Sequence, residues 1–322
     1  MESLQSQSLN KPAPKKRLQY IDIAKGLGIM LVILSHTEFW SDAFCRFFRH
    51  TTTIFFMPLF FLLSGLFYKP QQLKKRTIRL LISFLFFYTI TIGVHLYPVL
   101  FKGKPFDYNE AFGFLLGHPL EWNGPLWFLI SLTSIIIIAK KLTTPKGLIL
   151  SMLATSTIIL FNPKNYYYFG STLLGLSFFI TGNIFKDFFC HYHKWKWYLA
   201  AAFFVIISYF THPFPVCGVA AFIINISWME FFSISILSIF VIIGIAQFIE
   251  KIPIVSRILL YIGENSLIIF ATHLLIYKRI SFLHHEIISP TFTCLLSLIT
   301  VLLIEVPLIF ALNKYCSKLV GK

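Results

Sequence analysis

The chain has 322 residues, of which 57% are hydrophobic, 13% are charged and 37 are Phe. Because a soluble globular domain carries about 25% charged residues, this composition excludes a soluble enzyme, a disordered chain and a nucleic-acid-binding protein. The formal net charge is +15, and we assign it to the loops between apolar segments and to contact with anionic lipids. The apolar runs are too long for the short alternating strands of a membrane barrel. The composition therefore predicts an all-α, polytopic membrane helical bundle without a nucleic-acid partner.

The N-terminal residues 1–17 are polar and basic, and we expect them to form a cytoplasmic tail. The apolar run that follows is too long for a signal-peptide core and has no small-residue cleavage site, so it is expected to remain as the first span. We expect one transmembrane domain over residues 18–316 and a second short cytoplasmic tail over 317–322.

A helix needs about 20 largely apolar residues to cross the hydrocarbon core, and we assign ten segments as candidate spans, two of which are short. They are residues 18–40, 51–68, 76–101, 125–141, 147–161, 166–186, 197–211, 229–250, 261–279 and 290–315. The stretch 212–228 is also apolar, but His212, Pro213 and Pro215 predict a loop followed by a re-entrant or partial helix.

The distribution of Lys and Arg predicts the orientation of these spans. With the N-terminus inside, 20 basic residues lie in inner segments and 7 in outer segments, and Lys25 lies within the first span. Cytoplasmic loops carry an excess of Lys and Arg. We therefore expect ten spans with both termini in the cytoplasm.

The first span carries Lys25 and His36, and ionisable residues inside spans commonly mark functional sites. Eleven residues separate the two, which returns to within about 20° of the same helix face at a distance of about 16 Å. Histidine suits a general base near neutral pH. A snorkelling lysine and a histidine hydrogen-bonded across helices are the alternative. Gly26 and Gly28 would let another helix or a ligand approach closely.

A basic cluster follows the second span, which contains a Ser64-Gly65 pair. The cluster comprises Lys69, Lys74, Lys75, Arg76 and Arg79. Its charge is typical of an inner loop, but Arg76 and Arg79 lie one helical turn apart and could also grip a phosphate through their guanidinium groups.

Six motifs occur in order along almost the whole chain and together resemble the acyltransferase 3 family of integral-membrane acyltransferases, closest to its fucose 4-O-acetylase-like branch. They are Lys25-x10-His36, a PLFFxxSG span in residues 56–65, Arg76-x-x-Arg79, an LWFL segment in residues 124–129, Gly263-x-x-Ser266 with a following His273, and Glu305-x-Pro307. Two departures stand out: Lys25 replaces the more common arginine, and no acidic residue follows Trp127 within residues 129–133. A soluble esterase-like domain such as some relatives carry is not expected after the tenth span.

The resemblance implies an O-acyltransferase of the bacterial inner membrane that acylates a cell-envelope carbohydrate or lipid-linked glycan. Acetyl-CoA on the cytoplasmic side would be the donor, and no metal is implied. Transfer to a sugar hydroxyl needs a base, stabilisation of an oxyanion and exclusion of water. We expect His36 to be the base and Lys25, Lys75, Arg76 and Arg79 to hold the donor.

The supporting residues that we expect are Glu38, Ser64, Trp127, Ser266, His273 and Glu305. For His273, binding the acceptor, shaping the oxyanion site and simple packing all remain open. Trp127 would either stack on a sugar or adenine ring or anchor the helix at the interface. We expect Glu305 to partner a buried cation rather than to act in catalysis, and Glu38 faces away from His36 on a regular helix.

A competing function is a transporter or flippase of a lipid-linked glycan, with Lys25, His36, His273 and Glu305 along a polar pathway. No two-half repeat is visible in the sequence, and the cations concentrate at one inner loop. These features favour the enzyme. The sugar, the acyl length and the oligomeric state are left open by the residues.

Overall fold

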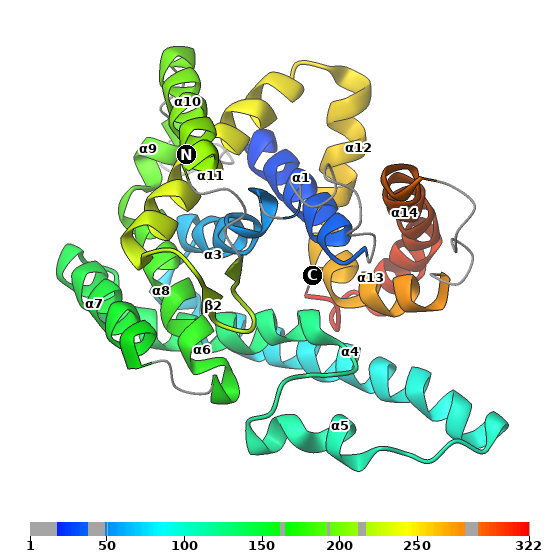
Figure 1. Cartoon of the computed structure of the whole chain (residues 1–322). Coiled ribbons are helices and arrows are strands. Elements are labelled where there is room, and N and C mark those ends of the chain that lie inside the picture. Colours follow the sequence, from blue (N-terminus) through cyan, green and yellow to red (C-terminus); the bar gives the residue numbers. More distant parts are fainter. Residues whose placement is uncertain are drawn as a thin grey trace, which may run out of the picture.

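The computed structural model describes residues 18–37, 49, 51–161, 165–191, 194–211, 217–280 and 289–321. Within these residues the chain is a bundle of helices with one short hairpin (Figure 1). The α-helices are α1 (Gln19–Ser35), α3 (Phe56–Leu66), α4 (Leu73–Lys102), α5 (Tyr108–Phe112), α6 (Trp127–Leu142), α7 (Pro145–Phe161), α8 (Phe169–Ile184), α9 (Lys186–His191), α10 (Trp195–Thr211), α11 (Trp228–Ile249), α12 (Pro253–Glu264), α13 (Ser266–Ile280) and α14 (Pro290–Tyr315).

Short elements connect these helices. Four single turns of 3-10 helix are η1 (Pro70–Gln72), η2 (Gly113–Leu116), η3 (Gly124–Leu126) and η4 (Tyr166–Tyr168). The strands β1 (Cys217–Gly218) and β2 (Ile223–Ile224) pair antiparallel, with Cys217 opposite Ile224.

Local sequence signals account for several helix ends. Proline opens α12 and α14, where its missing N–H costs nothing and its fixed φ suits the first turn. The Ser227 hydroxyl accepts a hydrogen bond from the Glu230 amide and caps α11. Gly103 adopts a φ of 64° directly after α4, so the helix stops where the sequence supplies a residue that tolerates this conformation.

Glycines allow two helix pairs to pack with their backbones in contact. A Cβ at Gly26 of α1 would overlap the Leu259 carbonyl of α12, and a Cβ at Gly263 would overlap the Asp22 carbonyl of α1. In the second pair, Gly65 of α3 lies against α8 in the same way. Gly28 faces the side chain of Phe60 on α3. The close approach expected at Gly26 and Gly28 is thus confirmed.

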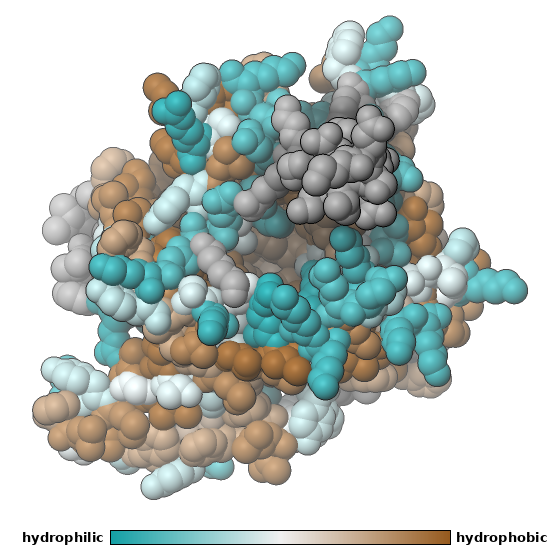
Figure 2. Space-filling model, turned by 180° about the vertical axis from the view of Figure 1, so that it is seen from behind, coloured by the Kyte–Doolittle hydropathy of each residue, from teal (hydrophilic) through white to brown (hydrophobic). Residues whose placement is uncertain are grey.

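The segment between α4 and α6 folds back along α4. The 30-residue helix α4 is about 45 Å long. The hydroxyl of Tyr88 in α4 donates to the Ala111 carbonyl of α5, and the ring of Phe84 in α4 lies 5.9 Å from that of Phe114 in η2. Large apolar side chains of α4, α5 and η2 remain exposed. Seen from behind, hydrophilic residues gather across the middle of the molecule and apolar residues dominate its lower part (Figure 2).

All ten predicted segments contain helix, but their lengths differ. Among the residues that the structure describes, four helices are long and apolar enough to cross a membrane, and the count is five if α12 and α13 form one broken span. The chain is therefore a multi-pass, all-α membrane protein, whereas the number of ten spans stays a prediction.

Three predicted boundaries were wrong. The first span is shorter than expected, since α1 ends at Ser35 and His36 is its C-terminal cap. The predicted span 261–279 is interrupted at Asn265, where α12 and α13 meet at an 81° bend. Between residues 217 and 227 the chain forms the hairpin and turns in place of a re-entrant or partial helix, and residues 212–216 lie outside the described part.

The C-terminal residues after α14 pack into the molecule. Val320 is only 2% exposed, and the guanidinium of Arg79 donates to the carbonyl of Gly321 over 3.5 Å. Figure 1 places the C-terminal end between α1, α13 and α4. This turn therefore lies on the same side of the bundle as the basic start of α4.

Candidate active site

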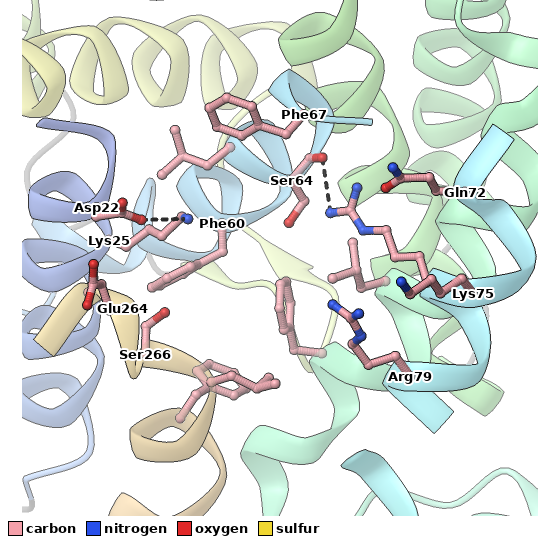
Figure 3. Close-up of a pocket in the computed structure, with 17 residues that line it drawn as sticks. Asp22, Lys25, Phe60, Ser64, Phe67, Gln72, Lys75, Arg79, Glu264 and Ser266 are labelled. Carbon is pink, nitrogen blue, oxygen red and sulfur yellow. Dashed lines mark hydrogen bonds and ion pairs between the residues drawn. The ribbon is translucent and has the colours of Figure 1, made fainter. Parts of the chain in front are cut away.

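A cavity of about 470 Å³ opens where α1, α3, α4, α6 and the α12–α13 bend meet. Figure 3 shows Lys25 with Asp22 on one wall and Lys75 with Arg79 on the other. The residues that line the cavity are Asp22, Lys25, Phe60, Leu63, Ser64, Phe67, Gln72, Lys75, Arg76, Arg79, Phe128, Leu132, Gly263, Glu264, Ser266, Leu267 and Phe270.

The four cations expected to hold the donor all line this cavity, although Lys25 is separated from the others by about 50 residues. The guanidinium of Arg76 also donates to the Ser64 carbonyl over 3.3 Å, which fixes the start of α4 against the end of α3. With Asp22 and Glu264 included, the lining carries a net charge of +2. Such a cavity attracts an anionic ligand and supplies guanidinium groups suited to phosphate.

Asp22 is a cavity residue whose place the sequence analysis missed. Its carboxylate lies 3.1 Å from the Lys25 ammonium, one turn along α1, and its side chain is almost buried. The i to i+3 spacing from Lys25 was the signal that predicts the pair.

The α12–α13 bend brings two further polar residues to the cavity, Glu264 and Ser266. Between them, the buried Asn265 ends α12 and donates from Nδ2 to the Tyr261 carbonyl over 2.8 Å. The Asn313 amide of α14 donates in turn to Oδ1 of Asn265 over 2.8 Å. The Gly263-x-x-Ser266 motif is thus a braced helix break, and Ser266 reaches the cavity because the helix breaks there.

Three phenylalanines form the inner end of the cavity. Phe60 comes from α3, Phe128 from α6 and Phe270 from α13, and each is less than 10% exposed. Their ring centroids lie 6.1 Å apart for Phe60 and Phe128, 6.3 Å for Phe60 and Phe270, and 5.3 Å for Phe128 and Phe270. We call these residues the phenylalanine trio.

Beyond the phenylalanine trio lie two histidines. The Phe270 ring centroid is 6.2 Å from that of His273, which is 5.3 Å from that of His36. The rings of His36 and His273 are therefore neighbours in the bundle. His273 is fully buried, whereas His36 at the end of α1 is partly exposed.

The hydrogen bond at His273 defines which ring nitrogen carries the proton. Its Nδ1 lies 2.8 Å from the Ile269 carbonyl, and a carbonyl oxygen can only accept, so Nδ1 is the donor. In the neutral ring the lone pair then lies on Nε2. This Nε2 is buried and has no hydrogen-bond partner among the described residues, so it can accept a hydrogen bond from a hydroxyl that enters beside His36.

Glu305 is placed differently from the expectation. Its carboxylate accepts a hydrogen bond of 2.6 Å from the hydroxyl of Thr272, and within the described part of the chain no cation lies within ion-pair distance of it. The predicted cation partner was therefore wrong. Thr272 contacts Glu305 of α14, whereas His273 contacts His36 at the end of α1. The hydrogen bond between Thr272 and Glu305 therefore connects α13 to α14 behind the histidine pair.

Trp127, another expected residue, does not line the cavity. Trp127 is buried at the start of α6, with its ring near those of Phe61 and Tyr168, so it packs against protein in this structure. Glu38 lies outside the described residues. In the described ranges, no group of three or more His, Cys, Asp or Glu side chains is arranged to hold a metal ion.

A family model described as an acyltransferase domain matches residues 18–307. The chain belongs to the acyltransferase 3 family. The match includes every helix that lines the cavity and both histidines, so the cavity and the histidine pair are parts of a membrane acyltransferase. As an enzyme of the acyltransferase 3 family, it uses an acyl donor and an acceptor. No curated protein and no solved structure is significantly similar to the chain.

Proposed function

We propose that this acyltransferase 3 protein moves an acetyl group from cytoplasmic acetyl-CoA to a hydroxyl of a cell-envelope glycan, and that it does so in the bacterial inner membrane. One observation carries the proposal. A basic cavity and a histidine pair lie at opposite ends of one short line of contacts through the phenylalanine trio. A two-substrate transfer requires this kind of layout, with a donor site, an acyl passage and a base.

On the donor side, Lys25, Lys75, Arg76 and Arg79 bind the phosphates of the CoA moiety. Charge-assisted hydrogen bonds from guanidinium groups to phosphate are among the stronger polar contacts in proteins. Ser64 and Ser266 add hydroxyl groups to the same lining. The acyl-pantetheine arm then runs inward past Lys25 toward the phenylalanine trio.

On the acceptor side, His36 is the general base, because it combines contact with the buried His273 and partial exposure at the end of α1. His36 takes the proton from the sugar hydroxyl, whose oxygen forms an ester bond with the acyl carbon. The bond from that carbon to the CoA sulfur breaks, and the proton passes finally to the thiolate. His273, whose tautomer the Ile269 carbonyl fixes, accepts a hydrogen bond that orients the acceptor.

Contacts between distant segments support this orientation of the two sides. Arg79 joins the start of α4 to Gly321, and both belong to segments expected inside. Thr37 lies 3.2 Å from the Cys294 sulfur, and Arg279 donates to the Val94 carbonyl over 3.1 Å. All four of these positions lie at or near span ends expected outside, so the charge rule and the packing agree.

The test is a transfer assay with the purified protein in liposomes. Acetyl-CoA labelled in the acetyl group is supplied with envelope glycans, and label in the glycan is measured beside label in free acetate. We expect saturable transfer that depends on the protein. Absence of both transfer and hydrolysis, with protein shown to be folded by size-exclusion chromatography, would contradict the proposal. Mass spectrometry of glycans from cells with and without the gene identifies the modified hydroxyl.

A further inference from the structure

We propose that Phe60, Phe128 and Phe270 form a size filter that restricts the transferred group to a short acyl chain. This inference rests on the proposed function, because it assigns the acyl specificity of the same site. The three rings come from three different helices, all line the cavity and contact one another, and one of them, Phe270, also contacts His273.

Their position on the path of the acyl group is the first argument. Phe270 contacts both the cavity and the ring of His273, so it stands between the charged lining and the histidine pair. An acyl group that approaches His36 from the cavity passes these side chains. Neighbours of the trio such as Phe61 are equally aromatic but lie outside the lining.

The rigidity of the trio is the second argument. On one side Phe60 meets the backbone of α1 at Gly28, where even a methyl group would come within 3.3 Å of the ring. On the other side Phe128 packs against Phe61, whose ring centroid lies 4.9 Å away and which is fully buried. Closely packed cores resist volume changes of a single methylene group. Rings held in this way can discriminate acyl chains by length.

The chemistry of the rings is the third argument. Each ring is apolar and offers no hydrogen bond to a sugar or a phosphate, but each suits contact with a small alkyl group. A missing or extra methylene in an apolar pocket changes reactivity by roughly 10- to 200-fold. The trio therefore has the composition expected of an acyl pocket and not of a glycan or nucleotide site.

The test compares acetyl-, propionyl-, butyryl- and octanoyl-CoA as donors for the wild type and for Phe60→Ala and Phe270→Ala. We expect the wild type to favour acetyl-CoA steeply. In each variant the ratio of butyryl to acetyl transfer should rise by about 10-fold or more, because the removed ring opens space for the longer chain. The milder variants Phe60→Leu and Phe270→Leu serve if the alanine variants fail to fold, with a smaller shift in the same direction.

The matched control is Phe178→Ala. Phe178 is also fully buried in an aromatic cluster, but its ring neighbours are Trp228, Phe231 and Phe232, away from the cavity. This variant should lose stability and keep the wild-type ratio. Unchanged ratios in the trio variants, or an equal shift in Phe178→Ala, overturn the size filter. If the wild type uses no acyl-CoA at all, the proposed function fails instead, so the two failures are distinguishable.

Discussion

His36 follows the last residue of α1, and this position makes a catalytic histidine compatible with an apolar helix. An imidazole in the middle of a span is costly unless it is partnered, whereas a cap residue can meet a ligand that arrives from the membrane surface. Its ring also contacts His273, which is held by a backbone carbonyl. A partly exposed histidine beside a buried one suits one proton-transfer step better than either alone.

We predict that His36→Ala lowers transfer per folded molecule by about 10²- to 10⁴-fold, as expected for loss of a general base. The acceptor hydroxyl then lacks its general base, since His273 only orients the acceptor in the proposed mechanism. Activity should be normalised to the monodisperse protein recovered by size-exclusion chromatography. A histidine with a purely structural role would give a lower yield with near-normal specific activity, and this pattern would remove His36 from the mechanism.

Arg76 and Arg79 carry the second prediction at this scale. Arg76→Ala and Arg79→Ala should each raise the KM for acetyl-CoA by roughly 10- to 150-fold, which corresponds to loss of one charge-assisted hydrogen bond. Lys74→Ala is the control, because Lys74 belongs to the same basic segment but does not line the cavity. Equal effects of all three substitutions would point to the charge of the loop and not to a donor site.

Single residues differ in how far they were predictable. Lys25, Arg76 and Arg79 stand out because charges are rare in an apolar sequence, and all three line the cavity. Phe60 could not be singled out, since one phenylalanine among 37 has no contrast. Thr272 was not predicted as the partner of Glu305, because a threonine hydroxyl in an apolar helix does not stand out in the sequence. A buried carboxylate suggests a cation as its partner instead.

At the scale of helices, the contact between α3 and α8 depends on two glycines. A Cβ at Gly65 would overlap the Phe179 carbonyl, and one at Gly182 would overlap the Leu62 carbonyl. Each carbonyl belongs to a helix backbone, so it cannot move away as a flexible side chain could. The pair therefore holds the Ser64 end of α3 in place beside the cavity.

We predict that Gly65→Val and Gly182→Val lower the thermal stability of the detergent-solubilised protein, with an overpacking cost of about 1–3 kcal/mol or more. Gly93→Ala is the control in α4, because a Cβ there meets no atom within 4 Å. Fluorescence-detected size-exclusion after heating measures the effect. If Gly93→Ala lowered the thermal stability as much as the two valine variants do, the close helix contact would not be the cause of their destabilisation.

The break between α12 and α13 shows why boundaries were harder to predict than helices. In residues 253–280 the apolar pattern is interrupted by Gly-Glu-Asn-Ser at positions 263–266, but no proline marks the bend. Asn265 ends α12 through hydrogen bonds to Tyr261 and Asn313, and Asn313 lies 48 residues further along the chain. Such a tertiary contact leaves no local trace. The all-α class, by contrast, follows from apolar run lengths alone, and each of the ten predicted segments contains helix.

At the scale of the whole molecule, the orientation in the membrane can be measured. In a variant with its five native cysteines replaced, we predict that a membrane-impermeant thiol reagent added outside labels Leu116→Cys and spares Gln71→Cys. Both positions are exposed, so access to the reagent depends on the side of the membrane. Labelling of Gln71→Cys in intact cells, confirmed by blocking controls after lysis, would reverse the proposed donor and acceptor sides.

The phenylalanine trio has an electrical consequence for the membrane that contains it. The polar cavity and the histidine pair lie close together on either side of Phe270, and protons move readily along chains of water and polar groups. Three aromatic rings offer no hydrogen-bonding atom to such a chain. In the reaction proposed above, the acyl group would pass the rings without a path for protons across the membrane, and CoA would stay on the donor side.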